Sequence, residues 1–409
     1  MLTVNWSGLF ARVVASVLLA IFALVLVCFG LGAYRVDRED AAFIQDRNWV
    51  QIFPQVLTLL GRRAVYQDMD YDRADGLFTT ALRTSPVHME AWVQLAKTAM
   101  LRKKRSQKAH RIEDMLGRAL SGVTTWKWQE FLLAYELEDE EAFTRIFNVI
   151  FERLPHRSMD SCFVASQFWG DWVEIARHLH RDNLPRFIYH CMRRRQTQAA
   201  LVAWEGLEHP DRKLCLRFAH YLLHQKEMKA AVSVWDQMIE GAPRRVYNGG
   251  FEQAPANRAF GWRFRRHGHV ALERDVFTRK QGRFALHLTF DGTQNLRFHH
   301  VYQILPVIPG DSYTLHFFHR SDEISTDQGV YVEVRGYRCK GLHEQGPMLT
   351  GTSDWKEVQV PFQVPKGCKA ILLRVRRDES LRLDNKISGQ YWLDQVFLTK
   401  EGDRGAAMQ

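Results

Sequence analysis

The chain has 409 residues, of which 46% are hydrophobic and 25% are charged, and its formal net charge is +10. This composition excludes a wholly disordered chain, and the length is enough for two or three domains. The modest excess of positive charge favours an anionic surface or polymer as a partner, although many basic proteins bind nothing acidic.

The first predicted element is a membrane helix from Val13 to Tyr34, a run without any charged residue. At 1.5 Å per residue this helix spans roughly 30 Å, which is the hydrocarbon thickness of a bilayer. A cleaved signal peptide has a shorter apolar core of about 7–15 residues, and it ends in small residues, whereas Leu31 stands at this exit. The sequence therefore predicts a tail and single-pass anchor over residues 1–34 and a juxtamembrane segment over residues 35–61.

Residues 62–245 predict paired helices, because four amphipathic runs each end at a proline, which cannot continue a helix. These prolines are Pro86, Pro155, Pro210 and Pro243. The last two stand about one 34-residue repeat apart, and apolar stripes at helical spacing lie between them. This pattern resembles a tetratricopeptide repeat and implies a short all-α solenoid of four or five hairpins.

A solenoid of stacked helix pairs presents a surface that binds protein segments. The alternative is a spacer between the membrane and the C-terminal region, and the sequence leaves both readings open. We expect no nucleic-acid partner, because the basic run at residues 193–195 has no aromatic side chains beside it on which bases would stack.

After Pro243 the pattern changes from a helical period to alternation of apolar and polar residues. Turn signals such as Asp291-Gly292 separate the alternating runs. The predicted strands are residues 284–290, 298–305, 312–319, 330–337, 355–363, 370–376 and 391–398. Seven or eight short strands predict an all-β jelly-roll sandwich over residues 246–400, followed by a C-terminal tail over residues 401–409.

Five motifs in this region follow one another in a characteristic order. They are Val-Tyr-Asn-Gly-Gly-Phe-Glu at residues 246–252, Gly261-Trp262, the run from Gln303 to Phe317, Trp355, and Gln-Tyr-Trp-Leu-Asp-Gln-Val-Phe-Leu at residues 390–398. This order resembles carbohydrate-binding modules of the galactose-binding-like, cellulose- and xylan-binding type. The resemblance covers most of residues 246–400 and implies a jelly roll that binds glycan.

The resemblance also implies a structural calcium ion that ties the first strand to the last. Glu252 matches the acidic position after Asn-Gly-Gly-Phe, and Asp394 matches the acidic position of the final strand. The alternative is that both carboxylates make ordinary hydrogen bonds, because Ca²⁺ takes six to eight oxygen ligands and two carboxylates are few. No other cofactor is expected.

Alternation within two of the strands indicates which side chains face a glycan. In residues 330–337 and 370–376 the aliphatic side chains face the core, so the tyrosines and charged residues between them face outward. Arginines on such a face can hold a carboxylate or sulfate by paired hydrogen bonds. The alternatives are a solvated outer face and, for the tryptophan, a packing role. The candidate ligand-binding residues are Trp262, His287, Gln303, Tyr331, Glu333, Arg335, Tyr337, Arg374 and Arg376.

No motif for catalysis or for a metal centre is evident. The sequence has no P-loop, nucleophile elbow, dinucleotide fingerprint or zincin helix, and its histidine pairs lack a third ligand at a diagnostic spacing. The six cysteines contain no Cys-X-X-Cys pair, and most are expected to be buried thiols. Whether Cys339 and Cys368 form a disulfide stays open.

These features together predict a non-catalytic, membrane-anchored accessory or scaffold protein of bacterial exopolysaccharide biosynthesis or export. The solenoid would bind partner proteins, and the sandwich would bind glycan, including anionic polysaccharide. We expect the bacterial inner membrane, with the C-terminal domains in the periplasm, although arginines flank both ends of the anchor. One alternative is a structural component of an envelope complex whose sandwich docks on protein, and another is a sugar-processing enzyme.

Overall fold

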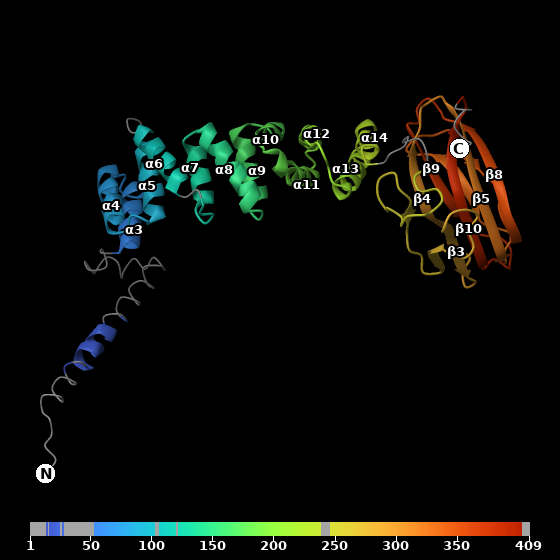
Figure 1. The fold of residues 1–409 in the computed structure, drawn as a ribbon, viewed down its shortest axis with the longest axis horizontal. Helices are drawn as coiled ribbons and strands as arrows, with labels where there is room; N and C mark the ends of the chain where they lie inside the picture. The colour runs from blue at the N-terminus through green and yellow to red at the C-terminus, as the bar shows by residue number, and fades with distance from the viewer. Residues whose placement is uncertain are drawn as a thin grey trace, which may run out of the picture. The chain divides into compact units, whose positions relative to one another are not determined.

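The computed structural model describes residues 14, 16–24, 27, 53–102, 106–119, 122–238 and 246–402. The chain divides into two compact units. Figure 1 colours the chain by residue number, from blue at the N-terminus to red at the C-terminus. The first unit comprises residues 1–190 and 198–206, and the second comprises residues 191–197 and 207–409. Helices make up the first unit, whereas every strand of the described residues lies in the second.

The predicted membrane anchor needs correction. Of the segment from Val13 to Tyr34, residues 14, 16–24 and 27 are described, and these are helical. Within the described ranges, no helix is both long enough and apolar enough to cross a membrane. A spanning helix needs about 20 consecutive, mostly apolar residues. The prediction of a single-pass inner-membrane protein is therefore contradicted. Most of the predicted juxtamembrane segment lies outside the described residues.

The predicted helical region is confirmed, and it begins earlier than expected, at Pro54. The helices are α3 (Pro54–Tyr66), α4 (Tyr71–Thr84), α5 (Met89–Leu101), α6 (Ser106–Ala119), α7 (Lys127–Glu136), α8 (Glu140–Arg153), α9 (Ser158–Phe168), α10 (Trp172–His178), the short 3-10 helix η3 (Arg181–Asn183), α11 (Leu184–Arg194), α12 (Thr197–Glu205), α13 (Arg212–His224) and α14 (Met228–Asp236). Neighbours such as α3 and α4, α7 and α8, and α13 and α14 pack together. The tetratricopeptide resemblance itself gains no support.

The same local chemistry recurs where one helix ends and the next begins. Met69 and Glu138 have positive φ, which ends the preceding helix in the left-handed conformation. The next residue in each turn, Asp70 or Asp139, accepts a hydrogen bond from a backbone N–H of the first turn of α4 or α8. The two helices of the first hairpin, α3 and α4, are closely packed. A Cβ on Gly61 of α3 would lie only 2.4 Å from the ring of Phe78 of α4, so the glycine is needed there.

The predicted β-sandwich is confirmed as two five-stranded sheets. The strands are β1 (Arg263–Phe264), β2 (Val270–Asp275), β3 (Ala285–Asp291), β4 (Phe298–Pro306), β5 (Ser312–Ile324), β6 (Tyr331–Gly336), β7 (His343–Gln345), β8 (Gly351–Gln363), β9 (Ala370–Arg377) and β10 (Ser388–Lys400). One sheet, here called the β4 sheet, has the order β1-β4-β9-β6-β7, and the other, the β10 sheet, has the order β2-β3-β10-β5-β8. All pairings are antiparallel.

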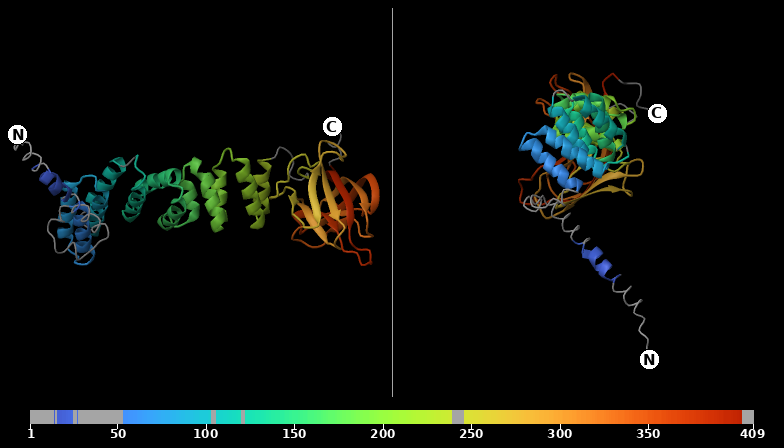
Figure 2. Two further views of the ribbon diagram at one scale, coloured as in Figure 1. Left: turned by 90° about the horizontal axis from the view of Figure 1, so that it is seen from below. Right: turned by 90° about the vertical axis from the view of Figure 1, so that its left-hand side faces the viewer.

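The core of the sandwich lies between the two sheets, which face each other in Figure 2. Val332 and Leu373 of the β4 sheet and Leu288, Phe317 and Leu393 of the β10 sheet belong to one buried apolar cluster. Along β6 and β9 the residues between these apolar positions point to the opposite face. The alternation predicted for these two strands is therefore the one observed, and it defines an outer face of the β4 sheet.

A disulfide joins Cys339, after β6, to Cys368, before β9. It answers the question that the sequence left open. Cys162, Cys191 and Cys215 are buried, as predicted, and Cys28 lies outside the described residues.

One core residue makes the stability of the sandwich depend on pH. His319 is fully buried, and its Nδ1 lies 3.3 Å from the hydroxyl of Tyr391. Burial, with help from Lys356, lowers the pKa of His319 to about 4 from an ordinary value of 6.5. The unfolded chain therefore takes up a proton between these two values and the folded chain does not, so stability falls as the pH falls through this window.

We expect this histidine to make the sandwich about 2 kcal/mol less stable at pH 5 than at pH 7.5. Hydrogen exchange of peptides from β5 and β10 across this pH range measures the change. In His319→Gln the stability difference between pH 7.5 and pH 5 should be smaller by about 2 kcal/mol, even if the substitution also lowers the stability at pH 7.5. Equal slopes for the variant and the parent would contradict the assignment.

Candidate functional site

One row of side chains crosses the outer face of the β4 sheet. Tyr302 of β4 stands opposite Arg263 of β1 on one side and opposite Arg374 of β9 on the other. Arg374 in turn stands opposite Glu333 of β6, and Glu333 stands opposite Gln345 of β7. Opposed residues of an antiparallel pair share a face. The register therefore brings together side chains that come from five separate segments of the sequence.

The centre of this face is a compact network of charged groups. The buried carboxylate of Glu333 forms an ion pair with Arg374. It also lies 3.1 Å from the Nε2 of His343 and 3.9 Å from the Nε of Arg376. Tyr331 donates its hydroxyl to Asp378, which also pairs with Arg376. Tyr331 and Glu333 are thus held beneath the arginines. Their chemical role here is to position the guanidinium groups.

Tyr302 lies at the more open part of the row. The guanidinium groups of Arg263 and Arg265 lie 5.4 and 5.1 Å from the centre of its ring. Arg265 also donates to the Tyr302 hydroxyl at 2.7 Å. A half-buried ring and two planar cations therefore occupy neighbouring positions on one surface.

The histidines at this face indicate that positive charge dominates it. The pKa of His299 is lowered by burial and then by Arg374, Arg376, Arg297 and Arg265. The pKa of His300 is lowered to about 4 by burial, by His267 and His299, and by Arg265. The acids in this layer, Glu333 and Asp378, are already paired with arginines. An added negative charge would therefore be attracted to this face.

The structure gathers some of the predicted ligand-binding residues and separates others. Five of them, Tyr331, Glu333, Arg335, Arg374 and Arg376, lie on the outer face of β6 and β9, and Tyr337 lines a pocket with Arg335 and Arg374.

Three predicted residues lie elsewhere. Trp262 is buried against Phe251 in the core. Gln303 is fully buried, and its side-chain amide donates to the carbonyls of Tyr247 and Phe260. His287 lies in the β10 sheet, stacked on Trp392.

Glu252 and Asp394 lie near enough for the charge of Glu252 to act on Asp394, and three of their four carboxylate oxygens already have backbone donors. Glu252 accepts from the backbone N–H groups of Arg283 and Phe284, and Asp394 accepts from those of Lys280, Gln281 and Gln395. Burial raises the pKa of Asp394, and the charge of Glu252 raises it further, against the backbone N–H groups that lower it. In the described ranges no group of three or more histidine, cysteine or acidic side chains is placed to hold a metal.

These side chains fit the hydrogen-bonded alternative better than a site for an ion that takes six to eight oxygen ligands. The calcium ion therefore stays a prediction, and no step of the proposed function depends on it.

Sequence reasoning missed Tyr302, Arg263 and Arg265. With the neighbouring Gln303 among the predicted ligand-binding residues, alternation would turn Tyr302 inward. Nothing in the local pattern showed which strands flank Tyr302. β1 has two residues, which is too short to give a periodic signal. Its pairing with β4 brings the two arginines onto the tyrosine.

No protein-family model matches the chain, and no curated protein matches it. Among solved structures, the chain is similar to TmCBM61 in complex with beta-1,4-galactotriose, at 17% identity and a TM-score of 0.28, over 39% of this chain and 99% of that one. It is similar to a CBM4 structure at 16% identity and a TM-score of 0.28, over 38% of this chain and 99% of that one.

A third similarity is to the C-terminal family 22 carbohydrate-binding module of Clostridium thermocellum Xyn10B. The identity is 13% and the TM-score is 0.29, over 40% of this chain and 98% of that chain. Each match spans about two-fifths of this chain and nearly the whole of the other. These are low similarities, and no ligand is carried over from them.

Proposed function

We propose that the C-terminal sandwich binds a glycan on the outer face of the β4 sheet, and that its preferred ligand is an acidic polysaccharide. The observation that carries the proposal is the row of Arg263, Tyr302 and Arg374 in a field of positive charge. A pyranose presents apolar faces to an aromatic ring, and its hydroxyl groups accept from planar donors. Arginine forks match carboxylate and sulfate groups.

The sequence motifs support glycan binding independently of the side chains on the outer face of the β4 sheet. The ordered motifs from residues 246–252 to residues 390–398 resemble those of carbohydrate-binding modules. They fall in a domain of two antiparallel sheets, the architecture that the resemblance implied.

The helical unit is proposed to bind a protein partner, and the whole chain is proposed to act as a non-catalytic accessory protein. A pocket of about 420 Å³ beside α5 and α6 is lined mostly by apolar side chains, among them Met89, Trp92, Met115 and Trp126. Val87 at its rim is 79% exposed. A role in polysaccharide biosynthesis or export, predicted partly from the membrane anchor, loses that support.

Affinity electrophoresis of the full chain in gels that contain polygalacturonate, alginate or xylan tests glycan binding. We expect retention by an acidic polymer and up to about tenfold weaker retention of Tyr302→Ala, since a ring contact of this kind contributes about 0.5–1.5 kcal/mol. Phe397→Ala is the matched control, because Phe397 is an exposed ring on the β10 sheet.

Absence of retention by any acidic or neutral polymer would overturn the proposal, and so would equal loss in both variants. Release of reducing ends from a retained polymer would contradict the non-catalytic role.

A further inference from the structure

A pocket of about 410 Å³ opens where β6 leaves the β4 sheet. Its lining is Arg335, Gly336, Tyr337, Arg338, Cys339, Lys340, Leu372 and Arg374. Half of these residues are cations, and none is acidic. Cations brought this close repel one another, so such a lining is stabilised by an anion.

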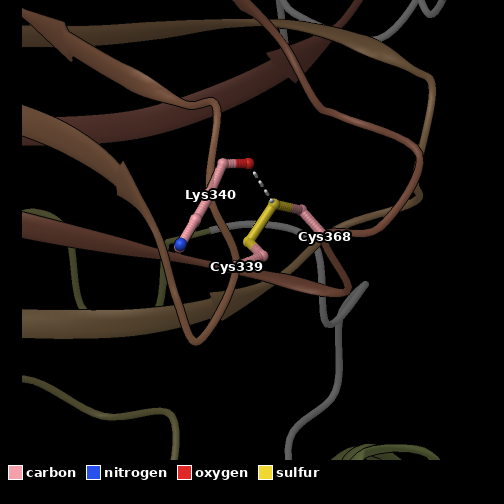
Figure 3. The surroundings of a disulfide bond; sticks show 3 residues. All are labelled: Cys339, Lys340 and Cys368. Carbon is pink, nitrogen blue, oxygen red and sulfur yellow. Dashed lines mark hydrogen bonds between the residues drawn. A yellow bond between two sulfur atoms is a disulfide. The ribbon is translucent and has the colours of Figure 1, made fainter.

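The turn that carries the cations is fixed to the sheet. The backbone N–H of Tyr337 donates to the carbonyl of Ala370 at 2.9 Å, and that of Gly336 donates to the carbonyl of Leu342 at 3.1 Å. Figure 3 shows the disulfide of Cys339 with Lys340 next to it in the chain. A Cβ on Gly336 would lie 2.7 Å from the sulfur of Cys339, so the strand passes directly against the disulfide. The pocket wall is therefore preorganised.

Two of the four cations are not committed to a partner. Arg374 pairs with Glu333, and Arg338 donates to the carbonyl of Leu223 at 3.4 Å. Arg335 and Lys340 are exposed, and within the described part of the chain neither cationic group has an ion pair. Their charges face the pocket without compensation.

We propose that this pocket is the subsite for one acidic substituent of the glycan, a carboxylate or a sulfate ester on a sugar ring. Arg335 offers a planar fork and Lys340 offers a point charge, a combination that suits an oxyanion. Arg374, whose Nε and Nη2 pair with Glu333, adds its charge to the pocket wall. Arg374 belongs both to the pocket and to the row with Tyr302, so a glycan lying along the row reaches the pocket. This inference rests on the proposed function, and it adds the acidic substituent by which the sandwich would distinguish one glycan from another.

The test compares one polymer in acidic and carboxyl-reduced form, for example polygalacturonate before and after reduction, and a sulfated polymer with its desulfated form. The full chain should prefer the charged member of one pair. In the double variant Arg335→Ala with Lys340→Ala, this preference should fall about tenfold or more, while the affinity for the neutral member stays unchanged. Arg283→Ala with Lys356→Ala removes two exposed charges elsewhere on the sandwich and is the matched control.

The outcomes separate the two proposals. If the preference for acid survives in the pocket variant, or falls equally in the control, the pocket is not the subsite and glycan binding stands. If the parent chain binds glycan but shows no preference for either charged polymer, the subsite and the proposed preference for acid are both overturned, and glycan binding itself stands.

If no polymer binds, the proposed function fails, and a direct probe decides the pocket. The probe is acetylation of Lys340 relative to Lys356 in the presence of glucuronate or of inorganic sulfate, read by mass spectrometry. Protection of Lys340 supports an oxyanion site of its own and shows which anion it takes. No protection overturns the site.

Discussion

Replacing Cys339 and Cys368 with alanine is expected to lower the free energy of unfolding of the sandwich by roughly 3–4 kcal/mol. The two residues are 29 apart in sequence, and a cross-link of that length restricts the unfolded chain by about this amount. Cys368 is fully buried. The disulfide joins the turn after β6 to the turn before β9, and these two strands pair at the centre of the outer face of the β4 sheet.

Hydrogen exchange by mass spectrometry isolates this effect, because peptides from β6 and β9 report the sandwich separately from the helical unit. Their protection should fall in the double alanine variant, whereas peptides from α3 to α8 should be unchanged. A phosphine reductant should destabilise the parent protein and leave the variant as it was. If reductant changes neither protein, the disulfide does not contribute as stated.

The largest single-residue effect is expected at Arg377, the last residue of β9. Its side chain is fully buried and donates to the carbonyls of Gln328 and Asn385, to Asn295 Oδ1, and to the carbonyl of Leu296. It therefore ties three loops to one end of the β4 sheet. Arg377→Met keeps the length of the side chain but removes every donor, and it should cost about 3–5 kcal/mol because the buried acceptors lose their partners.

Urea unfolding followed by hydrogen exchange of β4 and β9 peptides measures this loss. Arg377→Lys keeps the charge with fewer donors and should fall between the parent and the methionine variant. Arg382→Met, at an exposed position of the loop that follows, should change stability by less than about 0.5 kcal/mol. Equal effects at residues 377 and 382 would show that the buried network does not hold the loops.

Local periodicity was sufficient to predict the elements that carry the site. Alternation in β6 and β9 identified Val332 and Leu373 as inward and Arg335 and Arg374 as outward, because successive side chains of a strand point to opposite faces. Proline and apolar spacing likewise predicted the helical region. Three strands escaped prediction. β1 and β7 have two and three residues, too few for a period to appear. β2 has six residues, but its sequence Val-Ala-Leu-Glu-Arg-Asp does not alternate between apolar and polar residues.

Hydropathy alone gave a wrong answer at the N-terminus. The apolar composition of residues 13–34 was read as a membrane anchor, but spanning also requires a continuous helix of about 20 residues, and the described residues contain none that is long and apolar enough. The localisation inferred from that run was wrong for the same reason.

The sequence by itself determined the two fold classes in this chain, the position of the seven longest alternating strands along it, and the outward side chains of β6 and β9. Only the tertiary structure decided that Tyr302 stands between Arg263 and Arg374, that Gln303 turns inward, that Cys339 meets Cys368, and that Arg377 is buried. The physical reason is that a local period reflects which side of an element is buried, whereas strand register depends on residues far apart in the chain. The strand register is what brings the charged side chains together on the outer face of the β4 sheet and forms the pocket beside them.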